Sequence, residues 1–156
     1  MFNLKIESYL KLIFLVSLVS IVSAYFIEHI LGHQPCNLCL IERIPYGLSI
    51  ILIILNYFLE KNEKFIILLL IIIFAFSLII SIYHFGIEQG FFQESAVCDT
   101  KNFSENMTKE DLLKQLSEKN VSCKDVTFSF FGLSLTSINI VISLLFTITL
   151  LKIYNK

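Results

Sequence analysis

The stretch FIILLLIIIFAFSLIISIY, residues 65–83, decides the fold of this chain. Its nineteen residues carry no charge, and only Ser77 and Ser81 interrupt the apolar run. An α-helix rises about 1.5 Å per residue, so about 20 such residues cross the roughly 30 Å hydrocarbon core of a bilayer. The stretch therefore predicts a transmembrane helix.

Three further runs, residues 12–27, 44–59 and 126–151, are free of Asp, Glu, Lys and Arg. The last run is longer than a span needs, so its Phe-rich start is expected in the membrane interface. The sequence predicts a single domain over residues 1–156, with spans at about 12–30, 44–59, 65–84 and 133–152 and outward loops at 31–43 and 85–132. Pro45 stands at the start of the second span, where a helix tolerates proline.

The segment TKEDLLKQL, residues 108–116, resembles a helix start with a capping box, followed by leucines on one side. The predicted fold class is thus an all-α membrane protein, a four-transmembrane-helix bundle with a short surface helix in the second outward loop. A secretory signal peptide ending at Val22-Ser23-Ala24 is the alternative for the first run. The aromatic continuation Tyr25-Phe26 argues against it.

Composition supports a membrane class. Hydrophobic residues make up 56% of the chain and the mean hydropathy is +0.77, whereas soluble domains are about 45–50% apolar. The net charge is −1, and no basic patch with interleaved aromatics occurs, so nucleic-acid binding is not expected.

The distribution of charge predicts the orientation. Four spans put both termini on one side, where six lysines stand against three glutamates. The other side carries Arg43 and five lysines against ten acidic residues. Because short Lys-rich segments face the cytoplasm, both termini should be cytoplasmic. Both cysteine-containing loops should then face a periplasm-like compartment.

The stretch CNLCLIER, residues 36–43, lies between the first two spans and holds a reactive pair. Cys36 and Cys39 can close a small disulfide that is easily reduced, and a helix N-terminus or a cation would stabilise a thiolate there. If a helix begins near Cys39, Arg43 lies one turn on and offers a permanent positive charge to a thiolate or to a quinone oxygen. The stretch predicts a redox centre, although an inert disulfide or half a zinc site would use the same pair.

Cys98 and Cys123 form a second pair in the long loop, and an even number of cysteines permits two disulfides. One interpretation is a structural disulfide that closes the loop and is worth about 3 kcal/mol. The other is a mobile disulfide that meets a soluble partner and exchanges with Cys36 and Cys39. The spacing is not a second Cys-x-x-Cys, so no metal site is predicted.

Three polar residues near or inside the spans need an explanation. His84, at the end of the third span, is either an interfacial residue without a role or a group that bonds or protonates a quinone. Glu88 is expected to be a loop carboxylate, and Asn139 is expected to hydrogen-bond between helices.

Together these features resemble the DsbB family of quinone-dependent disulfide oxidoreductases. The motifs CNLCLIER (36–43) and YHFGIEQ (83–89) carry the resemblance, which extends over nearly the whole chain. The vitamin K epoxide reductase family also has a four-helix core, but its loop cysteines precede a late Cys-x-x-Cys. Here that order is reversed, which favours DsbB.

The resemblance implies a role for each cysteine. Cys98 would be attacked by a DsbA-like thioredoxin-fold protein, and Cys123 would be its mate. Cys36 and Cys39 would be the quinone-proximal pair, with Cys39 in a thiolate–quinone charge-transfer contact. Arg43 would support quinone binding.

His84 would lie near the same quinone, which is ubiquinone or menaquinone. The implied activity is re-oxidation of the DsbA-like partner in the bacterial inner membrane, with electrons passing to the membrane quinone pool. The alternative is a non-enzymatic four-helix scaffold with two structural disulfides. A disulfide reductase is disfavoured, because the predicted cytoplasmic side has no cysteine to receive its electrons.

Overall fold

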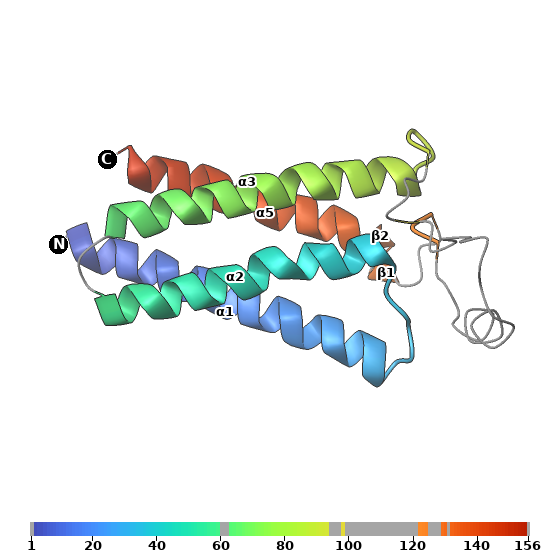
Figure 1. Cartoon of the computed structure of the whole chain (residues 1–156), viewed down its shortest axis with the longest axis horizontal. Helices are drawn as coiled ribbons and strands as arrows, with labels where there is room; N and C mark the ends of the chain where they lie inside the picture. Colours follow the sequence, from blue (N-terminus) through green and yellow to red (C-terminus); the bar gives the residue numbers. More distant parts are fainter. Residues whose placement is uncertain are drawn as a thin grey trace, which may run out of the picture.

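The computed structural model describes residues 2–59, 63–93, 98, 122–124, 129–130 and 132–155. Its long helices are α1 (Phe2–His29), α2 (Asn37–Leu59), α3 (Glu63–Glu88) and α5 (Leu135–Tyr154). Figure 1 shows them side by side in a bundle, with the start of α1 and the end of α5 at the same end. Each is long and apolar enough to cross a membrane. The predicted all-α four-helix membrane bundle is confirmed.

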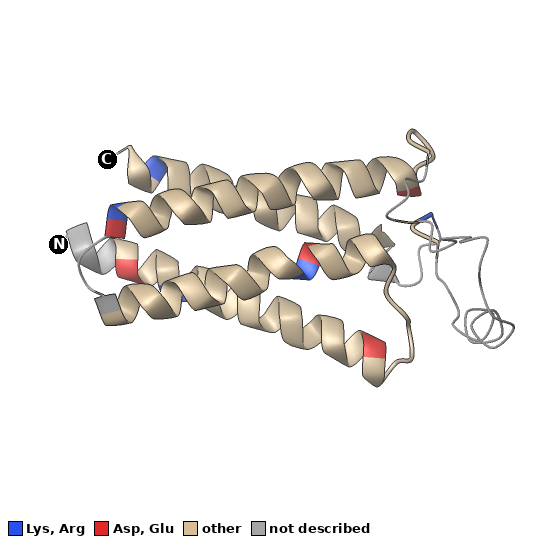
Figure 2. Cartoon of the chain, in the orientation of Figure 1, with Lys and Arg blue, Asp and Glu red and all other residues tan. Residues whose placement is uncertain are grey.

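The helices do not begin where the uncharged runs begin. α2 starts at Asn37, so part of the predicted 31–43 loop is helical and Pro45 lies inside the helix instead of at its start. The reason is that Glu42 and Arg43 both have partners in the bundle, His84 and Glu28 respectively. Figure 2 accordingly shows charge at the helix ends and at one place along α2. Paired charges do not have to lie in a loop.

The fourth helix begins after a short hairpin, close to the start of the span predicted at about residue 133. A two-residue hairpin, β1 (Ser129–Phe130) and β2 (Leu133–Ser134), precedes α5. Gly132 turns it with a φ of +79°, a backbone region that glycine enters readily. Ser134 then caps α5, because its hydroxyl accepts the Ser137 N–H. The predicted surface helix at residues 108–116 lies outside the described residues.

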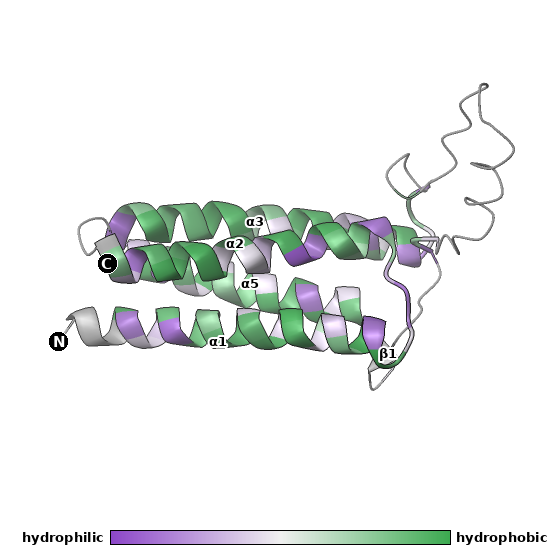
Figure 3. Ribbon diagram, turned by 60° about the horizontal axis from the view of Figure 1, so that its bottom comes forward, coloured by the Kyte–Doolittle hydropathy of each residue, from purple (hydrophilic) through white to green (hydrophobic). Residues whose placement is uncertain are grey.

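The bundle interior combines aromatic packing with hydroxyl and amide hydrogen bonds. Phe74 of α3 meets Phe146 of α5 edge-on, with ring centroids 5.0 Å apart. Asn139 of α5 donates to the Ser81 hydroxyl at 2.7 Å and accepts from the Tyr46 hydroxyl. The expected interhelical role of Asn139 is thus confirmed. Figure 3 shows the helices to be largely hydrophobic along their length, and many of their large apolar side chains are exposed, as a lipid surround requires.

Candidate functional site

The Cys36–Cys39 pair lies at the beginning of α2. Cys36 directly precedes the helix, and its Sγ accepts the backbone N–H of Cys39 at 3.3 Å, as an N-capping side chain would. The two Sγ atoms are 2.8 Å apart, and both residues are free cysteines. The pair is therefore in position to close a disulfide.

The surroundings of Cys36 favour its thiolate. Hydrogen bonds from the Cys39 thiol, the larger cause, and from His84 together lower the pKa of the Cys36 thiol to about 4, against the burial that raises it. A thiolate at a helix N-terminus is also stabilised by the helix dipole. Cys36 is thus a buried sulfur that gives up its proton more readily than an ordinary thiol.

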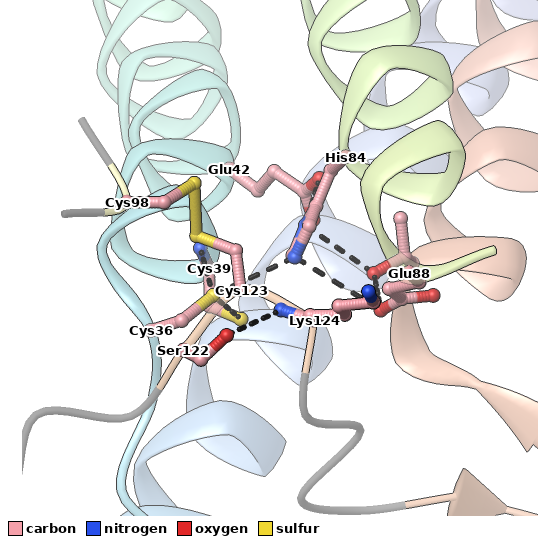
Figure 4. Close-up of a disulfide and its surroundings, with 10 residues drawn as sticks. Cys36, Cys39, Glu42, His84, Glu88, Cys98, Ser122, Cys123 and Lys124 are labelled. Carbon is pink, nitrogen blue, oxygen red and sulfur yellow. Dashed lines mark hydrogen bonds and ion pairs between the residues drawn. A yellow bond between two sulfur atoms is a disulfide. The ribbon is translucent and has the colours of Figure 1, made fainter. Parts of the chain in front are cut away.

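His84 connects this sulfur with two carboxyl groups. Its Nε2 lies 3.5 Å from Cys36 Sγ, and its Nδ1 lies 3.0 Å from Glu42 Oε1. The same Nδ1 is 3.3 Å from the Thr136 hydroxyl, which donates to Glu88 Oε1 at 2.6 Å. His84 is only 1% exposed. It therefore lies inside the bundle and not at its surface, and Figure 4 shows it between the cysteines and the carboxyl groups.

Glu88 is not the loop carboxylate expected from the sequence. It is the last residue of α3, and its side chain is 6% exposed. Its Oε2 is buried and has no hydrogen-bond partner within the described parts of the chain. Thr136 and His84 both face the Glu88 carboxyl group. Because these polar neighbours compensate its burial, the end of α3 lies inside the protein.

The second cysteine pair packs onto the first. Cys98 and Cys123 form a disulfide, with Cα atoms 5.6 Å apart and a sequence separation of 25. Both are buried and cluster with Cys36 and with Ile87. Figure 4 shows this disulfide directly beside the Cys36–Cys39 pair. All four sulfur atoms therefore lie at one end of the bundle.

Arg43 is held by α1. Its guanidinium donates to Glu28 Oε2 at 2.6 Å and lies over the Tyr25 ring, 5.4 Å from the ring centroid. The ion pair with Glu28 and the cation–π contact with Tyr25 together orient the guanidinium. The sequence predicted that Arg43 and Cys39 share one face of α2, and both line the same cavity.

That cavity lies between α1, α2 and α5 and has a volume of about 280 Å³. Its walls are mainly apolar side chains of α1 and α5. The polar groups that reach it from the site are Cys39, Glu42, Arg43 and Thr136. Cys36 and His84 are not among its lining residues. The sequence grouped His84 with Cys39 and Arg43; in the structure Cys39 and Arg43 line this cavity, and His84 contacts two of its other lining residues, Glu42 and Thr136.

Cys36, Cys39 and His84 also form a set of metal-ligand types, with one ligand atom from each within 4.8 Å of the others. Sequence spacing did not suggest this set, because His84 comes from a different helix. Structural zinc sites use four protein ligands, and this set has three.

Sequence reasoning did not assign a role to Glu42, Thr136 or Glu28. Glu42 stands three residues after Cys39, one helical turn away, and that spacing was a usable signal. Thr136 and Glu28 gave no such signal. They are far from the cysteines in sequence, and only helix packing brings them to the site.

Two comparisons with known proteins bear on this site. A family model described as "Disulfide bond formation protein DsbB" matches residues 7–153. An uncharacterized protein of Rickettsia prowazekii (strain Madrid E), RP370, is 29% identical over 145 residues, which cover 90% of this chain and 84% of the relative. Its name states no activity. The family match spans all the helices and all four cysteines.

Proposed function

The chain belongs to the DsbB family of disulfide bond formation proteins, and from this premise we propose that it is a quinone-dependent thiol:disulfide oxidoreductase. It takes electrons from a DsbA-like thioredoxin-fold dithiol through Cys98 and Cys123. It passes them to Cys36 and Cys39 and then to a membrane quinone.

One observation carries the proposal: the Cys36–Cys39 pair has a different neighbour on each side. Cys36 is buried against the Cys98–Cys123 disulfide, and Cys39 lines the apolar cavity together with Arg43. A pair that only braced the fold would need neither neighbour. An electron relay needs both, because each sulfur must meet a different exchange partner.

The chemistry of each exchange follows from the sulfur atoms. A partner thiolate attacks Cys98, forms a mixed disulfide and releases Cys123 as a thiolate. Closure of the partner's own disulfide then frees Cys98, so the partner leaves oxidised by two electrons. The reduced Cys98–Cys123 pair next exchanges with the Cys36–Cys39 disulfide. After this transfer Cys98 and Cys123 are again a disulfide, and the two electrons are held by the thiols of Cys36 and Cys39.

The cavity residues fit a quinone head group. Apolar side chains line most of it, as a flat ring requires, and a few polar groups can orient the ring oxygens. A bound quinone supplies a two-electron acceptor with two oxygens that take up protons. Arg43, fixed by Glu28, directs its positive charge into this space and would stabilise negative charge on an oxygen. Cys39 would be the sulfur that meets the acceptor.

The energetic direction depends on the acceptor. Each 30 mV of a two-electron couple is worth about 1.4 kcal/mol, so a quinone more oxidising than the thiol pairs makes the last step favourable. The same scheme requires that the cysteine loops face an oxidising compartment. We therefore propose a bacterial inner membrane location, with the cysteine loops periplasmic and both termini cytoplasmic.

The experiment mixes purified protein in detergent with a reduced thioredoxin-fold dithiol protein and a soluble quinone analogue, and follows loss of quinone absorbance. The wild-type chain should oxidise the dithiol and reduce the quinone in equal amounts. Cys98→Ser should abolish quinone loss with the protein dithiol. A small dithiol that reaches Cys36 and Cys39 directly should still support it, and this control separates a lost entry site from a misfolded chain.

The quinone-loss assay distinguishes the proposed electron shuttle from a structural membrane scaffold. Quinone loss from the protein dithiol that survives Cys98→Ser would exclude the proposed shuttle. No quinone loss in wild type, with any dithiol, would leave a membrane scaffold whose disulfides are structural.

A further inference from the structure

The two sulfur atoms of the Cys36–Cys39 pair differ in their access to the cavity. Cys39 lines it, whereas Cys36 is 5% exposed and faces His84 and the loop disulfide. Oxidation of a dithiol by a quinone moves two electrons and two protons, one proton from each thiol. The proton of Cys39 can leave directly into the cavity. The proton of Cys36 needs a path.

We propose that Glu42 carries the Cys36 proton to the acceptor in the cavity, with His84 as the link between the two. This inference rests on the proposed quinone reaction. Cys36 gives its proton to His84 Nε2, and His84 gives the proton on Nδ1 to Glu42 Oε1. Glu42 then gives a proton to a quinone oxygen. The two sulfurs form the disulfide, the electron pair goes to the quinone, and the quinol holds both protons.

The distances support each link. Cys36 Sγ and His84 Nε2 are 3.5 Å apart, within range of a hydrogen bond to sulfur, and His84 Nδ1 and Glu42 Oε1 are 3.0 Å apart. An imidazole can accept a proton on one nitrogen while it releases one from the other. Glu42 completes the path, because it both contacts His84 and lines the cavity.

Thr136 offers the competing path, since its hydroxyl also contacts His84 Nδ1 and lines the cavity. Two features favour Glu42. Its distance to Nδ1 is shorter, 3.0 Å against 3.3 Å. The Thr136 hydroxyl already donates its proton to Glu88 Oε1 at 2.6 Å. A carboxylate is also a far stronger base than a neutral hydroxyl, so it can hold the proton between the two steps.

Charged and titratable groups from several elements face this path. α2 contributes Glu42 and the Cys39 thiol, and the segment before α2 contributes His33, which lines the same cavity. α3 contributes Glu88, whose Oε1 lies 3.9 Å from His84 Nε2. The segment 122–124 contributes Lys124, whose side chain extends toward Glu88 in Figure 4. Arg43 of α2 pairs with Glu28 of α1. Within the site, only Glu42 and Thr136 are therefore substituted, which leaves these other groups in place.

The first test uses quinone-free, reduced protein and measures the pH profile of Cys36 alkylation by mass spectrometry. In wild type the imidazole of His84, supported by Glu42, holds the proton and leaves Cys36 ionised. Glu42→Gln removes the negative charge beside the imidazole, so the profile should move to higher pH by about one unit, a tenfold change in thiolate. Thr136→Val should move it less, and Glu63→Gln at the other end of α3 should not move it.

The second test measures reduction of the soluble quinone analogue driven by a small dithiol. Loss of a general acid–base group costs about 100-fold or more, so Glu42→Gln should lower kcat by that factor while KM changes little. Glu42→Asp keeps a carboxyl group and should restore part of kcat. Glu63→Gln serves as the matched control for the chemical change.

Two results would overturn the inference. The first is that Thr136→Val shifts the pH profile of Cys36 alkylation as much as Glu42→Gln does, or that neither variant shifts it. The other is a Glu42→Gln variant that reduces quinone at the wild-type kcat, or one in which KM alone changes. If wild type reduced no quinone at all, the proposed function would fail, yet the alkylation profiles would still decide whether Glu42 and Cys36 are coupled.

Discussion

His84→Ala should make the Cys36–Cys39 pair a weaker oxidant. In the structure, hydrogen bonding to Cys39 and to His84 lowers the pKa of Cys36 from 9.0 to about 4. A hydrogen bond to a charged group is worth about 1.5–3 kcal/mol, and one pKa unit is about 1.4 kcal/mol. Removing His84 should therefore raise the Cys36 pKa by about one to two units.

The direction of the change in reduction potential depends on which redox state of the Cys36–Cys39 pair contains the thiolate. A thiolate exists only above its pKa and only in the reduced pair, so raising this pKa destabilises the reduced form at pH 7. The equilibrium then shifts about 10- to 100-fold toward the disulfide. For a two-electron couple this lowers the reduction potential by roughly 30–60 mV.

The assay equilibrates quinone-free protein with dithiol buffers of known potential and traps free thiols with a mass tag. Cys98 and Cys123 are both replaced by Ser, so that only one pair is counted. Between its pKa and neutral pH the wild-type potential should fall by about 30 mV per pH unit, because one proton accompanies two electrons, and by about 59 mV per unit below it. In His84→Ala the break between these slopes should move up from about pH 4.

A matched control comes from His29→Ala. This histidine, at the end of α1, packs against Tyr25, with ring centroids 5.8 Å apart. Its replacement should leave the potential and the break unchanged. The reasoning is refuted if His84→Ala leaves the potential within a few millivolts of wild type or makes the pair more oxidising.

Two other changes have definite expectations. Arg43→Gln should raise the KM for the quinone analogue about tenfold, because the positive charge beside the cavity and its ion pair with Glu28 are lost. Both cysteine pairs should still form disulfides. Normal quinone turnover, measured by absorbance, would remove Arg43 from the proposal. Asn139→Ala should lower the free energy of unfolding by about 1 kcal/mol, because it removes the hydrogen bonds to Ser81 and Tyr46. A thermal unfolding midpoint equal to that of wild type would contradict the interhelical role of Asn139.

Some features of this protein followed from local patterns. Residues 65–83 predict a span because their length and apolarity match the bilayer, whatever the rest of the chain does. The spacing of Cys36 and Cys39 predicts a redox pair because three residues bring the sulfurs together in any helix start. Asn139 was correctly expected to bond between helices, since a buried amide in lipid needs a partner.

Other features did not follow from local patterns. The sequence placed Glu88 in a loop, because charged residues usually end a hydrophobic run. That prediction was wrong: Glu88 ends α3 and meets Thr136 on another helix, which compensates its burial. Glu42 and Arg43 likewise meet partners on other helices, so α2 can begin before the uncharged run at residue 44. A pattern confined to one helix contains no information about such partners.

The sequence by itself determined the number of spans, the position of the cysteines at one end of them and the resemblance to the DsbB family, because these depend on composition and on spacing along the chain. Only the tertiary structure decided which sulfur faces the cavity, and that His84 lies behind Glu42 and Thr136 instead of lining it. The physical reason is that rotation of one helix against its neighbours chooses the contacts of each side chain, and that rotation is set by packing from all the helices together.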